Sequence, residues 1–357
     1  MNYPRILLSI VLSQFLLISC EKEPDRSNDS VPPSLKGVFC INEGAFLASN
    51  GGVTFWPSDG SAGVVDLFST ANGFPAGDVL QSMRIHNGRA YLCVNNSQKI
   101  EVVSMADFKR LGTISGIAGP RYFLGLNDSL GVVSDWVSNQ VYLIHLNSFA
   151  PIDSLACGTG PDQMALVNNL LFVCNSGGFG EDSSITVINT NSFSVQATIQ
   201  TPVNPASIKT TTNGDLLVLC KGSLGDDFTP SPDDPGGAIL RINPTSLSVT
   251  DSIQYNWDQH PLQLQLSQDN TTAYFLMGTG AYTGKIVKQS ATDFNQAHQE
   301  LSNREFYSLG LETDGTRLYA GKASFSANTH TLRYTTQGSI IDSLPCGIAP
   351  NGFVFNP

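Results

Sequence analysis

Charged residues are scarce in this chain, and basic residues are the scarcer kind. Of 357 residues only 14% are charged, with 19 Lys and Arg against 30 Asp and Glu, for a net charge of −11. A nucleic-acid partner requires basic patches, and no basic cluster occurs in the sequence. Nucleic acid is therefore excluded as a partner. A hydrophobic content of 41% excludes a disordered chain.

Motifs of the common hydrolases and metal sites are also missing. The sequence has no HExxH pair, no GxSxG elbow and no CxxC or Cys/His zinc spacing. Four of its seven cysteines, Cys40, Cys93, Cys174 and Cys220, follow similar β-type residue pairs. We expect these four to serve as small buried apolar residues.

One glycine-rich stretch, SGGFGED at 176–182, raises the question of a phosphate-binding loop. Such a loop needs a helix behind it, whose N–H groups and dipole hold the anion. Here a β-type run, SITVIN, follows instead. The stretch is therefore interpreted as a turn between two strands.

The single long apolar run lies at the N-terminus. Residues 6–19 (ILLSIVLSQFLLIS) are the right length for the core of a signal peptide. The last three residues of this run together with the next one, Leu17-Ile18-Ser19-Cys20, resemble the lipobox of bacterial lipoproteins. This resemblance implies a lipid anchor on Cys20. Residues 20–36 are polar and contain proline, as expected of a tether. Glu21-Lys22-Glu23 resembles the export signal of Bacteroidetes surface lipoproteins, which implies an outer-membrane lipoprotein exposed at the cell surface.

Residues 37–357 carry an internal repeat. Pairs of β-type runs are split by turn residues at Asn87, Asn127, Asn168, Asn213, Asp269 and Asp314, spaced 40 to 56 residues apart. The last run, APNGFVFNP, resembles a first strand, and the opening run, GVFCINEG, resembles a second strand. These features predict an all-β, seven-bladed β-propeller of four-stranded antiparallel blades, closed by the C-terminal strand joining the N-terminal blade.

The longer loops of a propeller gather on one face, where ligands usually bind. Aromatic residues in these loops are predicted ligand contacts: Phe46, Trp136, Phe179, Trp257 and Tyr282. Polar residues at the ends of the second strands are predicted to surround the axis: Asn42, Asn95, Asn96, Asp135, Asn175 and Lys221. The alternative for these polar residues is the capping of strand ends.

Residues with side-chain oxygen atoms at the same strand ends support a second hypothesis, a metal-dependent enzyme. Glu43, Asn95, Asp135 and Asn175 could hold a divalent cation, which would make the protein a lactonase-like hydrolase or lyase. A glycan or protein adhesion module would use the same face.

The lipobox, the tether and the recurring GxxP…LxVxN units together resemble YncE-like seven-bladed surface lipoproteins of Bacteroidetes. One branch of that group captures cobalamin and passes it to a TonB-dependent outer-membrane transporter. The resemblance therefore implies a non-catalytic, membrane-anchored capture protein with a corrinoid as ligand and no required cofactor.

Overall fold

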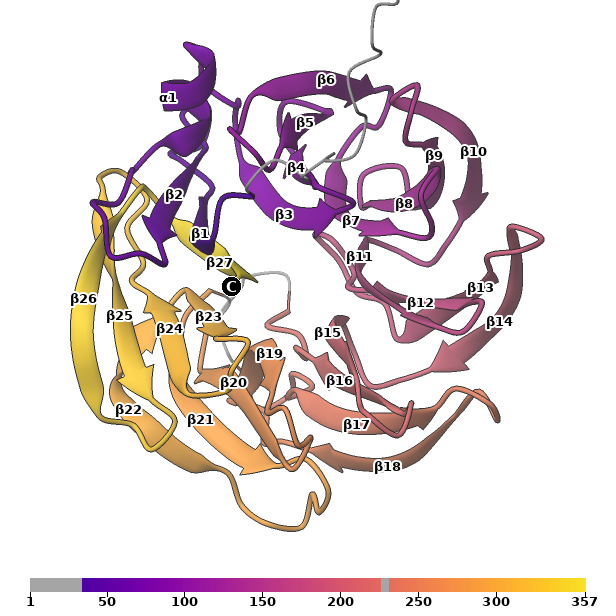
Figure 1. Ribbon diagram of the computed structural model, residues 1–357. Coiled ribbons are helices and arrows are strands. Elements are labelled where there is room, and N and C mark those ends of the chain that lie inside the picture. Colours follow the sequence, from indigo (N-terminus) through magenta and orange to yellow (C-terminus); the bar gives the residue numbers. More distant parts are fainter. Residues whose placement is uncertain (1–33, 226–230, 281) are drawn as a thin grey trace, which may run out of the picture. The chain divides into compact units, whose positions relative to one another are not determined.

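Seven small β-sheets stand around a common axis and form a closed ring (Figure 1). The computed structural model describes residues 34–225, 231–280 and 282–357. Six of the sheets have four antiparallel strands and one has three, so the predicted seven-bladed β-propeller is confirmed. The predicted signal segment at 1–19, the lipidation site Cys20 and the tether up to residue 33 lie outside the described residues. Within the described part, no helix has the length and apolar character needed to span a membrane.

Each blade is a meander that starts at the axis and ends at the rim. The innermost strands are β3 (Leu80–His86), β7 (Pro120–Gly125), β11 (Pro161–Val167), β15 (Pro205–Thr210), β19 (His260–Leu266), β23 (Ser308–Leu311) and β27 (Pro350–Asn356). The second strands are β1 (Gly37–Asn42), β4 (Arg89–Val94), β8 (Leu130–Asp135), β12 (Leu170–Asn175), β16 (Leu216–Cys220), β20 (Thr272–Gly278) and β24 (Arg317–Gly321). The third strands are β2 (Gly52–Pro57), β5 (Lys99–Ser104), β9 (Gln140–His145), β13 (Ser184–Asn189), β17 (Ala238–Asn243), β21 (Gly284–Ser290) and β25 (Thr329–Thr335). The outer strands are β6 (Arg110–Ser115), β10 (Ala150–Ala156), β14 (Ser194–Gln200), β18 (Ser248–Gln254), β22 (Gln299–Phe306) and β26 (Ile340–Cys346).

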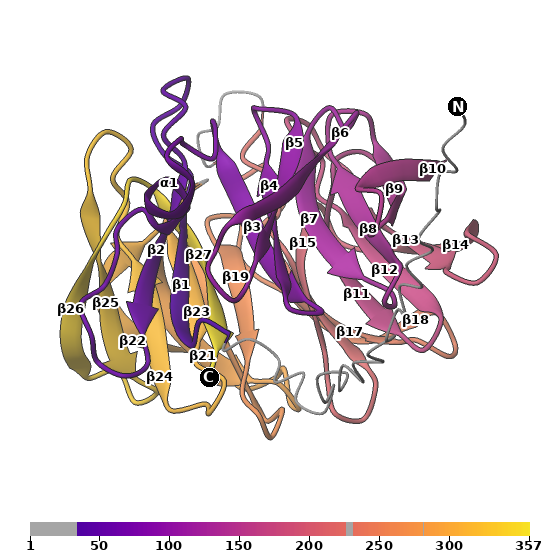
Figure 2. The ribbon, with the colours of Figure 1, turned by 45° about the horizontal axis from the view of Figure 1, so that its top comes forward.

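The strand order defines two faces of the ring. We call the lower face the one that carries the hairpins from first to second and from third to fourth strand. The upper face carries the connections from second to third strand and from each outer strand to the next blade. Figure 2 shows the inner strands running between these faces. At the lower face, Asn87 and Asn168 adopt φ values of 48° and 55°, the left-handed conformation that tight hairpins need.

Burial follows the position of a strand in its blade. The second strand β12 is buried along nearly its whole length, because it is covered by blades on both faces. Its neighbour at the rim, β14, is mostly exposed. The four cysteines of the second strands, Cys40, Cys93, Cys174 and Cys220, are all buried and free, which confirms the apolar role expected for them.

The ring is closed by hydrogen bonds between its two ends. Strand β27 pairs antiparallel with β1, from Gly37 opposite Asn356 to Asn42 opposite Pro350. The C-terminal strand thus supplies the innermost strand of a blade whose other strands come from the N-terminal end of the propeller. This is the closure that the two terminal runs predict.

The closing blade differs from the other six at its rim. In place of a fourth strand it has a single bridge between Phe55 and Val64, followed by the short helix α1 (Leu67–Asn72). Asp66 caps the start of this helix by accepting a hydrogen bond from the Ser69 N–H, and Gly73 ends it in the left-handed conformation. The repeat predicts a fourth strand in this blade, and the structure has the short helix α1 in its place. These two end signals explain the difference.

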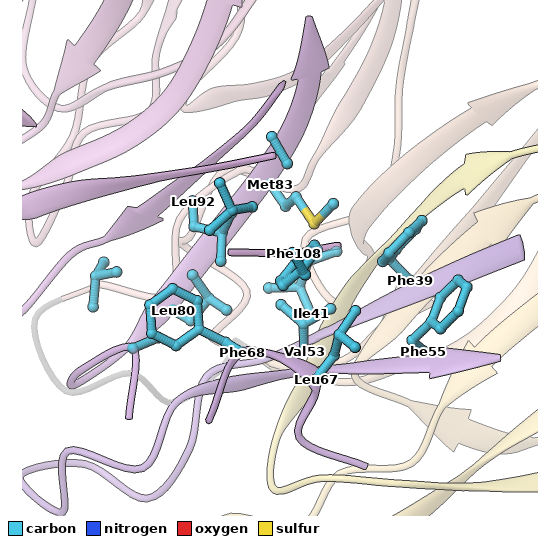
Figure 3. Packing of buried hydrophobic residues seen from close by; sticks show 14 of the residues in the cluster. Phe39, Ile41, Val53, Phe55, Leu67, Phe68, Leu80, Met83, Leu92 and Phe108 are labelled. Atoms are coloured by element: carbon cyan, nitrogen blue, oxygen red, sulfur yellow. The ribbon is translucent and has the colours of Figure 1, made fainter. Parts of the chain in front are cut away.

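An apolar cluster joins the closing blade to its neighbour and to α1 (Figure 3). Phe39 of β1 is fully buried at its centre and stacks on Phe55 at 4.6 Å and on Phe108 at 5.9 Å between ring centroids. Leu67 and Phe68 of α1 complete the cluster. The helix therefore covers the apolar edge that the missing fourth strand leaves.

We expect Phe39→Ala to lower the free energy of unfolding by about 3–5 kcal/mol, because it removes a buried ring and leaves a cavity at the closure. Urea denaturation followed by circular dichroism measures this loss. The matched control is Phe179→Ala, whose side chain is 85% exposed and which should change stability by less than about 0.5 kcal/mol. Equal losses in the two variants would contradict the assignment of the closure core.

Candidate functional site

The upper face carries nearly all exposed aromatic side chains of the described residues. Phe46 (72% exposed), Phe179 (85%), Tyr282 (63%), Phe325 (51%) and Trp257 (39%) all lie in its loops. Among the described residues, one further exposed aromatic side chain, Phe74, lies outside these loops. It packs against Phe68 of α1, with the guanidinium of Arg110 over its ring. Apolar groups exposed in this number on one face are typical of a binding surface.

Trp136, at the end of β8, links this aromatic surface to the axis. Its ring packs against Phe179 with 4.8 Å between centroids, and the guanidinium of Arg121 lies over it at 4.6 Å. Phe179 comes from the glycine-rich stretch 176–182, which forms the connection between β12 and β13 and is followed by a strand. The interpretation of this stretch as a turn is therefore confirmed.

A network of charged side chains lies at the upper end of the axis. Arg121 on β7 donates hydrogen bonds to Gln81 Oε1 on β3 and to Asp162 Oδ2 on β11, the latter at 3.1 Å. Ser176 Oγ donates to the same Asp162 oxygen at 3.2 Å. The guanidinium therefore connects three adjacent blades. We call these four residues, with Glu43 and Lys221, the axial cluster.

Glu43 and Lys221 complete the axial cluster from other blades. Tyr307 Oη donates a hydrogen bond of 2.8 Å to Glu43 Oε2, and this bond spans 264 residues of sequence. The carbonyl of Lys221 lies 2.9 Å from His260 Nδ1. Burial raises the pKa of Glu43, although Tyr307 and Arg121 partly offset this effect. Burial lowers the pKa of Lys221, with Asp162 acting in the opposite direction.

The pKa of Arg121 reports the balance of charge in the axial cluster. Burial by itself would lower this pKa, but Asp162 and, more weakly, Glu43 hold it above its usual value. The side chains of Arg121 and Asp162 are only 17% and 7% exposed. Their ion pair is therefore largely removed from water, where breaking it is costly.

Several buried polar atoms near the axis have no hydrogen-bond partner among the described residues. They include Arg121 Nε, Trp136 Nε1 and His260 Nε2. A buried polar atom without a partner costs free energy, and at a concave site it commonly serves a ligand or water. One of these nitrogen atoms, Arg121 Nε, belongs to the axial cluster, and another, Trp136 Nε1, is on the ring that packs against the exposed Phe179.

Some of the predicted polar residues lie near the axial cluster, and others form hydrogen bonds that cap the ends of strands. Asn42 Nδ2 donates to Thr54 Oγ1 and Asn175 Nδ2 donates to Thr186 Oγ1, both on third strands. The carboxylate of Asp135 accepts hydrogen bonds from the N–H groups of Ala118, Val137 and Ser138. These three residues therefore take the capping role that the sequence left as the alternative.

The remaining predicted residues lie beyond the ends of their strands, Asn95 and Lys221 by one position and Asn96 by two. Asn95 Nδ2 donates to the carbonyl of Pro120, and Asn96 Nδ2 donates to Asp78. Lys221 lies in the axial cluster, where Asp162 and Arg121 both influence its pKa. Trp136 and Ser176 also directly follow second strands, so the residue after the strand, rather than its last residue, reaches the axis.

The residues proposed as ligands of a divalent cation mostly have other hydrogen-bond partners. In the residues that the structure describes, no three His, Cys, Asp or Glu side chains are placed to hold a metal ion together. Of the proposed ligands Glu43, Asn95, Asp135 and Asn175, Asp135 uses its carboxylate on backbone N–H groups and Asn175 uses its amide on Thr186. Glu43 faces Tyr307 instead.

Sequence reasoning missed Arg121, Asp162, Gln81 and Tyr307. Arg121 and Asp162 each directly follow the proline that begins an inner strand, Pro120 and Pro161. The recurrence of a charged residue directly after this proline is the sequence signal that could have identified both residues as neighbours at the upper end of the axis.

The sequence of the chain matches a known protein family. A family described as "Domain of unknown function (DUF5074)" matches residues 36–329. The chain belongs to this family. No curated protein matches it in sequence.

Solved structures resemble this member of the DUF5074 family in fold. A quinonprotein alcohol dehydrogenase-like protein from Bacteroides thetaiotaomicron is 15% identical, with a TM-score of 0.66 over 90% of this chain and 79% of the other. A functionally unknown protein from Desulfotomaculum acetoxidans is 11% identical, with a TM-score of 0.63 over 90% and 98% of the two chains. Hydrazine synthase from Kuenenia stuttgartiensis is 14% identical, with a TM-score of 0.62 over 74% and 85%. At these identities the likeness concerns the fold alone.

We expect Arg121→Met to cost about 3–5 kcal/mol of stability, because it leaves the buried Asp162 without its cation. The double variant Arg121→Met/Asp162→Leu should recover much of this loss, since it removes both charges. Chemical denaturation of the two single variants and the double variant forms the cycle that measures the coupling. Additive losses would show that the pair is not coupled.

Glu43 gives the axial cluster a pH dependence. Its pKa is higher in the folded than in the unfolded state, so its ionised form opposes folding at neutral pH and has no effect once both states are protonated. Glu43→Gln should therefore be more stable than the parent at pH 7, and the difference should vanish as the pH falls to about 4. Thermal unfolding between these pH values tests this, with the exposed Glu181→Gln as control. A difference that grows on acidification would contradict the sign.

Proposed function

We propose that this protein is a non-catalytic capture protein that binds a large amphipathic ligand on its upper face. The observation that carries the proposal is the gathering of Phe46, Phe179, Trp257, Tyr282 and Phe325 on that face, exposed by between 39% and 85%. Aromatic rings held out in solvent by a rigid scaffold can stack on a flat ligand with little loss of side-chain entropy.

The axial cluster supplies the polar half of this site. Arg121 Nε and Trp136 Nε1 have no partner among the described residues, and Trp136 touches the exposed ring of Phe179. A ligand that combines a flat apolar surface with many hydrogen-bonding groups would satisfy both parts of the site. A corrinoid such as vitamin B12, a planar macrocycle bearing amide side chains, has this chemistry.

The cellular role follows from the sequence resemblances at the N-terminus. A lipid on Cys20 would anchor the protein to the outer membrane, and the tether at 20–36 would hold the propeller at the cell surface. There it would pass the bound corrinoid to a TonB-dependent transporter. The ligand contacts in this proposal are the loop aromatic residues and the axial cluster, which includes Lys221.

The test is calorimetric titration of the protein with cyanocobalamin. We expect one-to-one binding that weakens at least tenfold in Trp257→Ala and in Tyr282→Ala, as is typical when a central aromatic contact is removed. The control is Ile152→Ala, an exposed apolar residue on the outer strand β10, away from the upper-face loops.

Two results would contradict the proposal at different levels. Absence of heat, with no retention of the coloured ligand in dialysis, would exclude a corrinoid and leave a glycan or protein as the occupant of the face. Tight binding that neither aromatic variant weakens would keep the corrinoid but exclude the upper-face site.

A further inference from the structure

The propeller contains a cavity along its axis, and the exposed aromatic residues of the upper face are not among its described lining residues. The cavity, of about 820 Å³, is lined by residues of all seven inner strands. Its wall extends from Gln81 and Asn351 near the upper end to His86 and Asn356, the last residues of their strands. Arg121 and the other charged members of the axial cluster do not line it. The cavity thus lies below the axial cluster and extends to the lower face.

The charge of this cavity is opposite to that of the protein. Its wall includes Arg84 and Lys209 but no Asp or Glu, although the chain has 30 acidic residues. Neither cation forms an ion pair with a described residue. Arg84 is exposed, whereas Lys209 is half-buried. A half-buried ammonium without a counterion is costly to maintain, and such groups commonly serve a function.

The two cations face each other across the axis. Arg84 lies on β3 and Lys209 on β15, whose blades are three places apart in the ring, and both residues line the cavity. Burial, and then repulsion from Arg84, lower the pKa of Lys209 to about 8. The other titratable groups on the wall are Tyr122, whose pKa burial raises to about 12, and His86, which is hydrogen-bonded to the Asn127 carbonyl.

Amide side chains supply neutral hydrogen-bonding groups around the cations. Gln263 and Gln265 donate through Nε2 to the carbonyls of Asn351 and Leu309, and their Oε1 atoms have no partner among the described residues. Gln163 accepts from the Ile208 N–H through Oε1, which leaves its Nε2 able to donate. These donors and acceptors suit the hydroxyl groups of a ligand.

We propose that this channel binds a small polyhydroxylated organic anion, with its phosphate or carboxylate held between Arg84 and Lys209 and its hydroxyl groups on the glutamines. A guanidinium fork and an ammonium are the usual partners of such anions. The volume fits a small organic molecule and is far larger than an inorganic ion requires. The proposal does not depend on corrinoid binding at the upper face.

Calorimetry of the purified protein at pH 7 with glucose 6-phosphate, gluconate and glucose tests this site. We expect at least one anion to bind at least tenfold more tightly than the neutral sugar, and the two anions separate a phosphate from a carboxylate preference. Lys209→Met and Arg84→Gln should each weaken the anion at least tenfold. Lys109→Met, at an exposed lysine outside the cavity, should leave it unchanged.

The pH dependence gives a second readout. Gluconate keeps its charge above about pH 5, so its affinity should fall as the pH rises above about 8, where Lys209 loses its proton. This fall should be absent in Lys209→Met. Anions that bind no better than glucose, or that bind both cavity variants as tightly as the parent, would overturn the proposal.

Discussion

The pairing of β1 with β27 is the constraint on which the rest of the structure depends. Seven blades define a closed axis only if the two ends of the ring meet, and here they meet through a six-residue antiparallel register. The pairing places β27 among the inner strands, where Asn351 to Asn356 complete the wall of the axial cavity. It also fixes β1, so that Glu43, one residue beyond that strand, meets Tyr307 from the preceding blade.

Closure also explains how an irregular blade is tolerated. The closing blade lacks a regular fourth strand, yet it is held by hydrogen bonds on both sides of β1 and by the apolar cluster around Phe39. Helix α1 covers the side that a fourth strand would occupy. Because burial rather than strand number supplies most of the stabilisation, a six-residue helix with two buried apolar residues can take this place.

Much of the fold could be predicted from the sequence because its signals are local. Turn residues such as Asn87 and Asn168 determine the conformation of their own hairpins. Because each blade other than the closing one has one such turn, their spacing along the sequence predicts the number of blades. Helix α1 was missed, since its signals are a single cap at Asp66 and a single glycine at Gly73, which weigh little against a repeat seen in every other blade.

The candidate site was harder to predict because it depends on which way individual side chains point. Asn42 and Asn175 end their strands facing the third strands, whereas Glu43 and Ser176, one residue later, face the axis. A shift of one residue reverses direction in a strand, and β-type runs do not mark strand ends that finely. Placing Phe46, Phe179 and Tyr282 in loops required only the order of the strands, and the structure places all three exposed in those loops. Their role as ligand contacts stays a prediction.

The placement of charge along the axis argues that the axial cavity and the upper face have separate roles. Asp162 and Glu43 at the upper end are engaged by Arg121 and Tyr307, so they do not neutralise the cations lower down. A counterion for Lys209 or Arg84 would need only one acidic residue on the channel wall, yet none of the described lining residues is Asp or Glu. The wall instead keeps its positive charge inside a protein of net charge −11. Since low-dielectric walls strengthen the field of a partly buried charge, the channel is an attractive place for an anion even though the protein surface is not.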